Sequence, residues 1–271
     1  MSYDTLVLSG NSTNAVFTLG ALQRLYEEKI LIKSNVVTYL GTSSGSIVSL
    51  LLALDFEPLD ILAALCANKS YSKFSRLNLA NIGIGGVLTF DPIETELENL
   101  IMSRIGYIPT MIDMKEKFNK SLFFVTFNMT TGSKEYVSHE SYPTLPVIKA
   151  VRMSCTFPFI FTPFEYEGNV YIDGGISDNF PMNKAQSLGG CCLGVCTVNN
   201  CKPYTPSMNI LELFLHLFYI FISSSVDNAV ESPGSKIIQL KHDSSFFNFT
   251  SSNPELIKLF DCGYDECRSR Q

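Results

Sequence analysis

Val36-Val37-Thr38-Tyr39-Leu40-Gly41-Thr42-Ser43-Ser44-Gly45 runs into the apolar segment 46–54, and this stretch decides the fold. Residues 36–40 predict a buried strand, and residues 46–54 predict a buried helix. Between them, G-x-S-x-G is typical of a sharp strand-to-helix turn, where Gly41 and Gly45 leave room beside the serine. The turn would place the Ser43 hydroxyl where the first N–H groups of the helix point. Small-residue turns also occur for packing reasons, so Ser43 is a candidate nucleophile that needs a partner.

The chain around this turn alternates between strand and helix. Strands are expected at 5–9 and 36–40, and helices at 15–29, 46–54 and 58–67. This alternation predicts a single α/β domain with a mostly parallel central sheet covered by helices on both faces. Beyond a glycine-rich loop at 81–90, we expect helices from Asp91 as N-cap and at 145–153 and 182–187, and strands at 121–129, 135–137, 170–172, 191–198 and 236–240.

Composition narrows the class of partner. The 271 residues are 46% hydrophobic and 17% charged, with a net charge of −6, which suffices for a substantial core. No cluster of five or more basic residues occurs, so nucleic acid is not an expected partner, and the charge does not favour anionic membranes. The first residues lack the basic start of a secretory signal, so we expect an intracellular protein with reduced cysteines.

The eight cysteines do not indicate a metal site. Cys191, Cys192 and Cys196 lie in a segment that reads as a buried strand, and paired C-x2-C spacing is missing. We therefore expect no metal. The apolar segment 209–225 is interrupted by Glu212 and His216 and is shorter than the roughly 18–20 residues that span a bilayer. It is interpreted as a buried helix or, alternatively, as an interfacial helix that makes peripheral membrane contact.

A second motif, Asp173-Gly174-Gly175, follows the short strand expected at 170–172. The end of a strand is where α/β proteins collect functional groups, and the glycines Gly174 and Gly175 would let a second backbone approach the carboxylate. A serine nucleophile needs a base within hydrogen-bond reach. The histidines are His139, His216 and His242, and none has the surroundings of a strand-end catalytic loop. A Ser43–Asp173 dyad fits better, and a triad using His242 is the alternative.

The chain resembles the patatin-like phospholipases, lipid acyl hydrolases that use a Ser–Asp dyad. The resemblance rests on four stretches in the family's order: Leu6-Val7-Leu8-Ser9-Gly10 with the following helix, Gly41-Thr42-Ser43-Ser44-Gly45-Ser46, the segment 150–161, and Tyr171-Ile172-Asp173-Gly174-Gly175 with Asp178-Asn179-Phe180-Pro181. It implies that Ser43 is the nucleophile and Asp173 its base. It also implies a lipid or fatty-acyl ester substrate and no cofactor. On this basis we expect residues 5–200 to form the catalytic core, and residues 201–271 to form a C-terminal extension of helix and strand packed on the same domain.

One loop departs from the family pattern. The family has G-G-G-x-[K/R]-G after its first strand, whose backbone N–H groups form the oxyanion hole, whereas this chain has Gly10-Asn11-Ser12-Thr13-Asn14-Ala15. Asn tolerates positive φ better than other non-glycine residues, so Gly10, Asn11 and Ser12 are the expected oxyanion donors. The alternative is a catalytically impaired lipid-binding or scaffold protein. Apolar residues that could line an acyl channel are Ile82, Ile84, Val87, Leu88, Phe90, Phe157, Phe159, Phe161 and Phe164.

Overall fold

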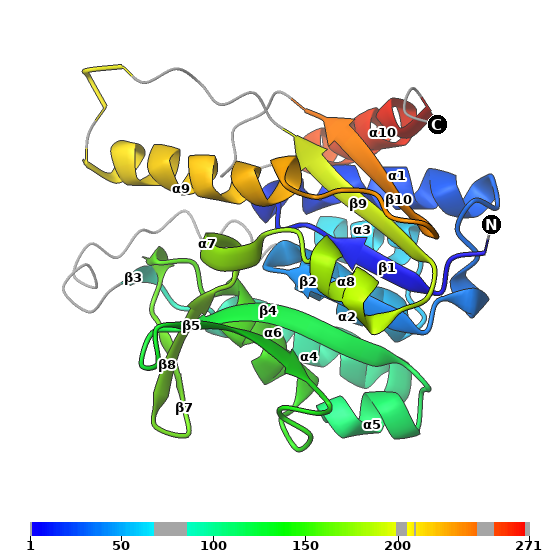
Figure 1. The fold of residues 1–271 in the computed structure, drawn as a ribbon, viewed down its shortest axis with the longest axis horizontal. Helices are drawn as coiled ribbons and strands as arrows, with labels where there is room; N and C mark the ends of the chain where they lie inside the picture. Colours follow the sequence, from blue (N-terminus) through cyan, green and yellow to red (C-terminus); the bar gives the residue numbers. More distant parts are fainter. Residues whose placement is uncertain (1, 68–85, 199–204, 209, 243–251, 269–271) are drawn as a thin grey trace.

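A central sheet organises the molecule in the computed structural model, which describes residues 2–67, 86–198, 205–208, 210–242 and 252–268 (Figure 1). Its strands lie in the order β10-β9-β1-β2-β4-β8-β7, with β5 beside β4. A separate pair, β3 and β6, forms a small second sheet. The strands are β1 (Thr5–Leu8), β2 (Thr38–Thr42), β3 (Gly86–Leu88), β4 (Ser121–Asn128), β5 (Ser133–Ser138), β6 (Phe159–Phe161), β7 (Phe164–Tyr166), β8 (Asn169–Asp173), β9 (Cys192–Val198) and β10 (Ser235–Lys241).

The five strands from β10 to β4 pair in parallel, and β8, β7 and β5 pair antiparallel. All four residues of β1 are buried because helices cover both sides of the sheet. The predicted mostly parallel α/β fold is therefore confirmed. At the edge where Thr42 ends β2, β4 pairs Val125 with Thr42 and Thr126 with Asp173. This strand brings the two sequence motifs to the same region.

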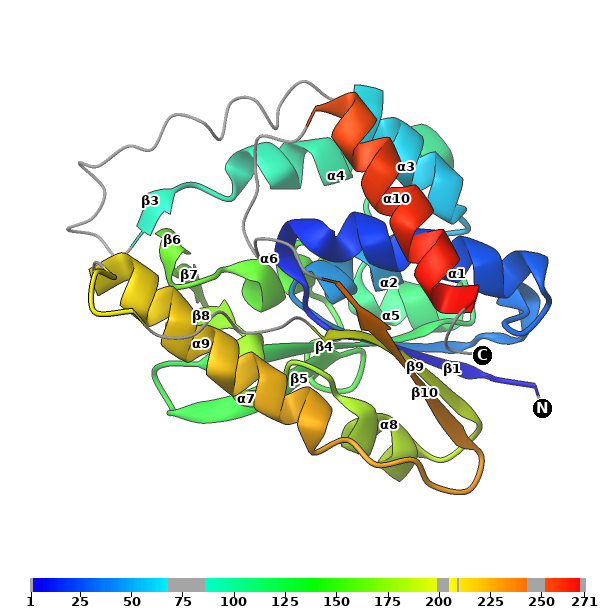
Figure 2. The same cartoon turned by 90° about the horizontal axis from the view of Figure 1, so that it is seen from above.

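Helices lie on both faces of the sheet (Figure 2). Alternate residues of β1 divide the core: Leu6 and Leu8 join the larger apolar cluster, and Val7 joins a smaller cluster with Met182 and Val226 on the other face. The helices are α1 (Ala15–Glu27), α2 (Ser44–Ala53), α3 (Pro58–Ala67), α4 (Asp91–Ile105), α5 (Met111–Glu116), α6 (Val147–Cys155), α7 (Gly175–Asp178), α8 (Met182–Leu188), α9 (Ile210–Asp227) and α10 (Asn253–Arg268), with 3-10 turns at Ser12–Asn14 and Lys33–Asn35.

Two local expectations were wrong. The segment 81–90 was expected to be a loop, but its residues Gly86–Leu88 form β3, which pairs with β6; residues 81–85 lie outside the described residues. Asp91 was expected to be an N-cap, but Phe90 is the N-cap residue and Asp91 begins α4. The Asp91 carboxylate still lies in the first turn, where its negative charge interacts favourably with the positive end of the helix dipole.

The segment 209–225 corresponds to α9, which buries one face only. Phe218, Ile222 and Val226 are buried, whereas Leu217 and Ile220 are 47% and 49% exposed. The buried residues recur every four positions, as one face of a helix requires. No helix among the described residues is long and apolar enough to cross a bilayer.

The last helix, α10, lies in the extension for which helix and strand were expected without bounds, and it packs against α1. Glycines allow the two backbones to approach closely: a Cβ on Gly20 would lie 1.9 Å from the Phe260 carbonyl oxygen, and a Cβ on Gly263 would lie 1.9 Å from the Phe17 carbonyl oxygen. Real Cβ atoms never approach an oxygen this closely. The two glycines therefore set the distance between the first and last helices.

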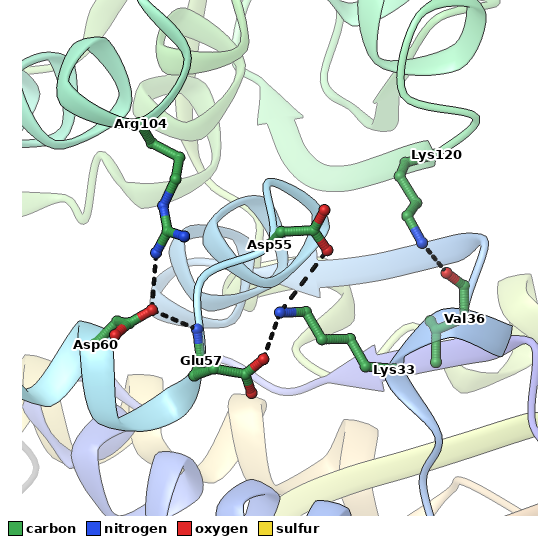
Figure 3. Close-up of polar contacts among 7 residues, drawn as sticks. All are labelled: Lys33, Val36, Asp55, Glu57, Asp60, Arg104 and Lys120. Atoms are coloured by element: carbon green, nitrogen blue, oxygen red, sulfur yellow. Dashed lines mark hydrogen bonds and ion pairs between the residues drawn. The ribbon is translucent and has the colours of Figure 1, made fainter.

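Charged side chains link the helices at the end of α2 opposite Ser43 (Figure 3). Arg104 of α4 donates to Asp60 of α3 at 2.7 Å, and the same carboxylate oxygen accepts the Glu57 N–H at 3.1 Å. Lys33 lies 2.7 Å from Glu57 and 3.7 Å from Asp55. Because these groups are partly exposed, each ion pair adds little stability. The Arg104–Asp60 pair joins α4 to α3, and Lys33 joins the turn before β2 to the loop between α2 and α3.

Candidate active site

Ser43 occupies a strained turn between β2 and α2. It is a non-glycine residue with φ 52° and ψ −128°, and it is the N-cap residue of α2, although its side chain makes no capping hydrogen bond. Strain of this kind is typical of functional sites. Its hydroxyl is thus held at the first turn of the helix without being used for capping. This is the geometry predicted for a nucleophile at a strand-to-helix turn.

The glycines of both motifs stand where a side chain would collide with backbone. A Cβ on Gly41 would lie 2.5 Å from the Gly45 oxygen, and a Cβ on Gly45 would lie 2.6 Å from the Leu8 oxygen. Beside the aspartate, a Cβ on Gly174 would lie 2.3 Å from the Val125 oxygen. These contacts explain why each turn needs glycine at these positions.

Asp173 ends β8 and its side chain is 1% exposed. Its Oδ1 accepts the Gly175 N–H at 2.8 Å, whereas its buried Oδ2 has no hydrogen-bond partner among the described residues. Burial raises the pKa of this carboxyl to about 7, against weaker lowering effects of the nearby Ser43 hydroxyl and the Gly175 N–H. The structure thus brings Ser43 and Asp173 together, and Oδ2 is an acceptor with open capacity.

The loop after β1 uses two of the predicted oxyanion donors internally. The Gly10 N–H donates to the Asn179 carbonyl at 3.1 Å, and the Asn11 N–H donates to Ser44 Oγ at 3.0 Å. The Asn11 side chain donates to the Asn14 carbonyl. Positive φ falls on Ser12 (50°), not on Asn11 (−148°), so the expected conformational role of Asn11 was wrong.

A cavity of about 420 Å³ opens beside Ser43. Ser12, Ser43 and Cys155 lie among its lining residues, which otherwise come largely from apolar side chains of α1, α2, α3 and α4, with Leu256 of α10. Of the acyl-channel candidates, Phe90 lines the cavity. Phe157 and Phe159 instead pack against Phe214 of α9, and residues 82 and 84 lie outside the described residues.

None of the three histidines is among the described residues that line this cavity. His242 follows β10, three strands away from β2 in the sheet, and its ring stacks on Phe17 with centroids 4.4 Å apart. His139 packs edge-on against Phe123. The geometry therefore favours the dyad over a triad that uses His242.

Comparison with known proteins places this geometry in a family. A family model for patatin-like phospholipases matches residues 6–185. The chain is 34% identical over 192 residues to "Probable lipid hydrolase 463L" of Invertebrate iridescent virus 6, an alignment that covers 68% of this chain and 63% of the viral protein. It is 26% identical over 276 residues to "Uncharacterized protein R571" of Acanthamoeba polyphaga mimivirus, covering 95% of this chain and 90% of that protein.

Among solved structures, VipD from Legionella pneumophila shares the fold with a TM-score of 0.57 and 19% identity, covering 99% of this chain and 66% of that one. The chain thus spans just under two thirds of VipD and of the iridescent virus protein. Since the family model covers most of the chain and both motifs, the chain belongs to the patatin-like phospholipase family.

Proposed function

We propose that this protein is a lipid acyl hydrolase that cleaves fatty-acyl esters through Ser43 and Asp173. The observation that carries the proposal is a strained serine beside a buried carboxylate whose Oδ2 accepts no hydrogen bond from the residues that the structure describes. The apolar cavity next to Ser43 supports an acyl chain as the group that is bound. Family membership and the similarity to a protein named a probable lipid hydrolase support the same substrate class.

In the proposed reaction, Ser43 Oγ attacks the ester carbonyl carbon while its proton passes to the Asp173 carboxylate. The tetrahedral intermediate expels the alcohol, which takes the proton from Asp173, and an acyl-serine remains. Water then loses a proton to Asp173 and attacks the acyl-serine, and the fatty acid leaves with the Ser43 oxygen reprotonated. The donors that stabilise the oxyanion are proposed to be Gly10, Asn11 and Ser12 after a local rearrangement, because two of their N–H groups are used internally.

A fluorophosphonate probe tests the nucleophile directly. We expect the wild-type protein to be labelled and Ser43→Ala to remain unlabelled, with both folds checked by circular dichroism. The labelling rate should rise with pH through about 7 and then level off, because only the deprotonated Asp173 accepts the serine proton. A folded wild-type protein that is never labelled would overturn the proposal.

Lipid binding without catalysis is the second candidate, and the occupied Gly10 and Asn11 N–H groups are the observation that favours it. Losing one preorganised oxyanion donor typically lowers the rate about 10²–10³-fold. A folded protein that binds lipid vesicles but neither hydrolyses ester nor reacts with the probe would support this candidate.

We further propose that α9 contacts the lipid surface from which the substrate enters. Its buried face packs on the segment that follows Asp173, where Ile222 lies 3.4 Å from a Cβ placed on Gly175. Its outer face exposes Leu213, Leu217 and Ile220. The helix contains no Lys or Arg, so the attraction would be apolar and insensitive to salt.

Sedimentation with phosphatidylcholine vesicles checks this surface. Leu217→Asp should weaken binding about tenfold, because it places a charge on the apolar face, without changing labelling by the soluble probe. Leu59→Asp is the matched control, since Leu59 is similarly exposed (51%) but lies on α3. Equal binding by both variants, or binding that high salt removes, would contradict the proposed surface.

A further inference from the structure

The last turn of α6 and the residue after it contact both members of the proposed dyad. The Ser43 N–H donates to Ser154 Oγ at 2.9 Å, and the Asp173 N–H donates to the Thr156 carbonyl at 2.9 Å. Between them, Cys155 Sγ lies 3.5 Å from Ser46 Oγ, which in turn donates to the Ser43 carbonyl at 2.6 Å. Three consecutive residues thus hold the backbone of the nucleophile from both sides and the backbone of the base.

This segment is itself fixed in place. Ser154 and Thr156 are fully buried, and the Thr156 hydroxyl donates to the Arg152 carbonyl at 2.7 Å. Arg152 pairs with the buried Glu94 of α4 at 2.6 Å. Thr126 Oγ1 lies within hydrogen-bond distance of the carbonyls of both Met153 (2.9 Å) and Ile172 (3.0 Å), so β4 holds α6 and β8 together. A segment anchored in this way can fix the distance between two groups that it touches.

We propose that Ser154 is a positioning residue that keeps Ser43 in its strained conformation, and that residues 154–156 set the spacing of the dyad. A serine at φ 52° relaxes toward negative φ unless its neighbours prevent it. The Ser154 hydroxyl accepts the Ser43 N–H, which belongs to the peptide plane whose orientation relative to the Ser43 side chain is set by that φ. This inference rests on the proposed function, since it assigns a role in the reaction of Ser43 and Asp173.

Ser154→Ala removes the acceptor and only one heavy atom. We expect the rate of fluorophosphonate labelling and the kcat for p-nitrophenyl butyrate to fall about 10- to 100-fold, because a misplaced nucleophile loses its alignment. KM should stay within about twofold, because the cavity is unchanged. Ser154→Thr, which keeps the hydroxyl, should recover part of the loss. Amide hydrogen exchange at Ser43 should become faster in Ser154→Ala but not in Ser154→Thr.

Ser49→Ala is the matched control, because Ser49 is also fully buried and its hydroxyl donates to the Leu40 carbonyl at 3.3 Å without touching the dyad. Labelling of Ser154→Ala at the wild-type rate, or an equal loss in Ser49→Ala, would overturn the inference. If the wild type is not labelled at all, the proposed function fails. In that case faster Ser43 amide exchange in Ser154→Ala still supports the positioning contact, and unchanged exchange refutes it.

Discussion

Replacing Asp173 by Asn is expected to abolish ester hydrolysis and, at pH 8, to stabilise the fold. The amide cannot accept the Ser43 proton, so turnover should fall by at least about 10⁴-fold. The stabilisation has a separate cause: at pH 8 the native protein holds a buried carboxylate whose Oδ2 has no hydrogen-bond partner within the described part of the chain. Asn removes that charge while its side-chain oxygen can still accept the Gly175 N–H.

The pH dependence separates the two effects. The pKa of Asp173 is about 7 in the folded protein, above its ordinary value of 3.8, so the folded state binds the proton more tightly. Proton binding by Asp173 therefore contributes its full stabilisation to the wild-type protein below about pH 4. This contribution is lost as pH rises through about 7, and the loss is on the order of 4 kcal/mol. The gain in unfolding free energy from Asp173→Asn should be absent near pH 4 and largest above pH 7. Burial of the new amide NH2 group without an acceptor should reduce this gain.

Thermal unfolding of wild type and Asp173→Asn at pH 5 and pH 8 measures this gain. We expect the midpoint to rise by several degrees at pH 8, since about 1 kcal/mol corresponds to roughly 2–4 °C in a chain of this size, and to rise less at pH 5. Ser43→Ala is the control: it should also be inactive, but it keeps the buried carboxylate and so still loses stability as pH rises, with the Asp173 pKa somewhat higher because the Ser43 hydroxyl no longer lowers it. Full activity in Asp173→Asn would disprove the dyad.

Replacing Gly263 by Ala is expected to destabilise the protein by about 3 kcal/mol or more. The new methyl group would lie 1.9 Å from the Phe17 carbonyl oxygen, which is backbone and cannot rotate away. The helices α1 and α10 must then separate, which opens the packing around Phe260 and Cys267. The intrinsic preference of Ala for helices recovers only about 1 kcal/mol.

Urea unfolding of Gly263→Ala beside Cys262→Ala checks this expectation. Cys262 is the preceding residue on α10 but is exposed, so its replacement should change the free energy of unfolding by less than about 0.5 kcal/mol. Equal stability of the two variants would mean that α10 does not pack on α1 in solution. Since Leu256 of α10 lines the cavity, Gly263→Ala should also lower the activity on long-chain esters.

The fold, and the proximity of Ser43 to Asp173, could be predicted because short-range signals determine both motifs. Strand, glycines and helix around Ser43 lie within twenty residues, and Asp173 ends a strand beside two glycines. The bounds of α10 were not predicted, although Asn253-Pro254-Glu255 is a helix-start signal and apolar residues recur at 257, 260 and 264. Its packing depends on Gly20 and Gly263, whose relation is visible only in three dimensions.

The details of the site depend on contacts between residues far apart in the chain. Nothing in the sequence places Ser154 under the N–H of a residue more than one hundred positions earlier. The loop after β1 gave a wrong expectation for a similar reason. Residue preference favours Asn for positive φ, but the Asn11 N–H is hydrogen-bonded to Ser44 and Asn11 has a negative φ. The positive φ of this loop lies at Ser12 instead.

The order of strands also decides how much of this chain must be produced for study. The family match ends at residue 185, yet β9 begins at Cys192 and covers the side of β1 that faces away from β2. A recombinant fragment cut at the family boundary would leave the buried strand β1 as an open sheet edge, a surface that invites aggregation. It would also lack the helix that supplies Leu256 to the cavity. Insoluble or inactive material from such a fragment would therefore say nothing about the proposed function, and expression trials should extend through Arg268.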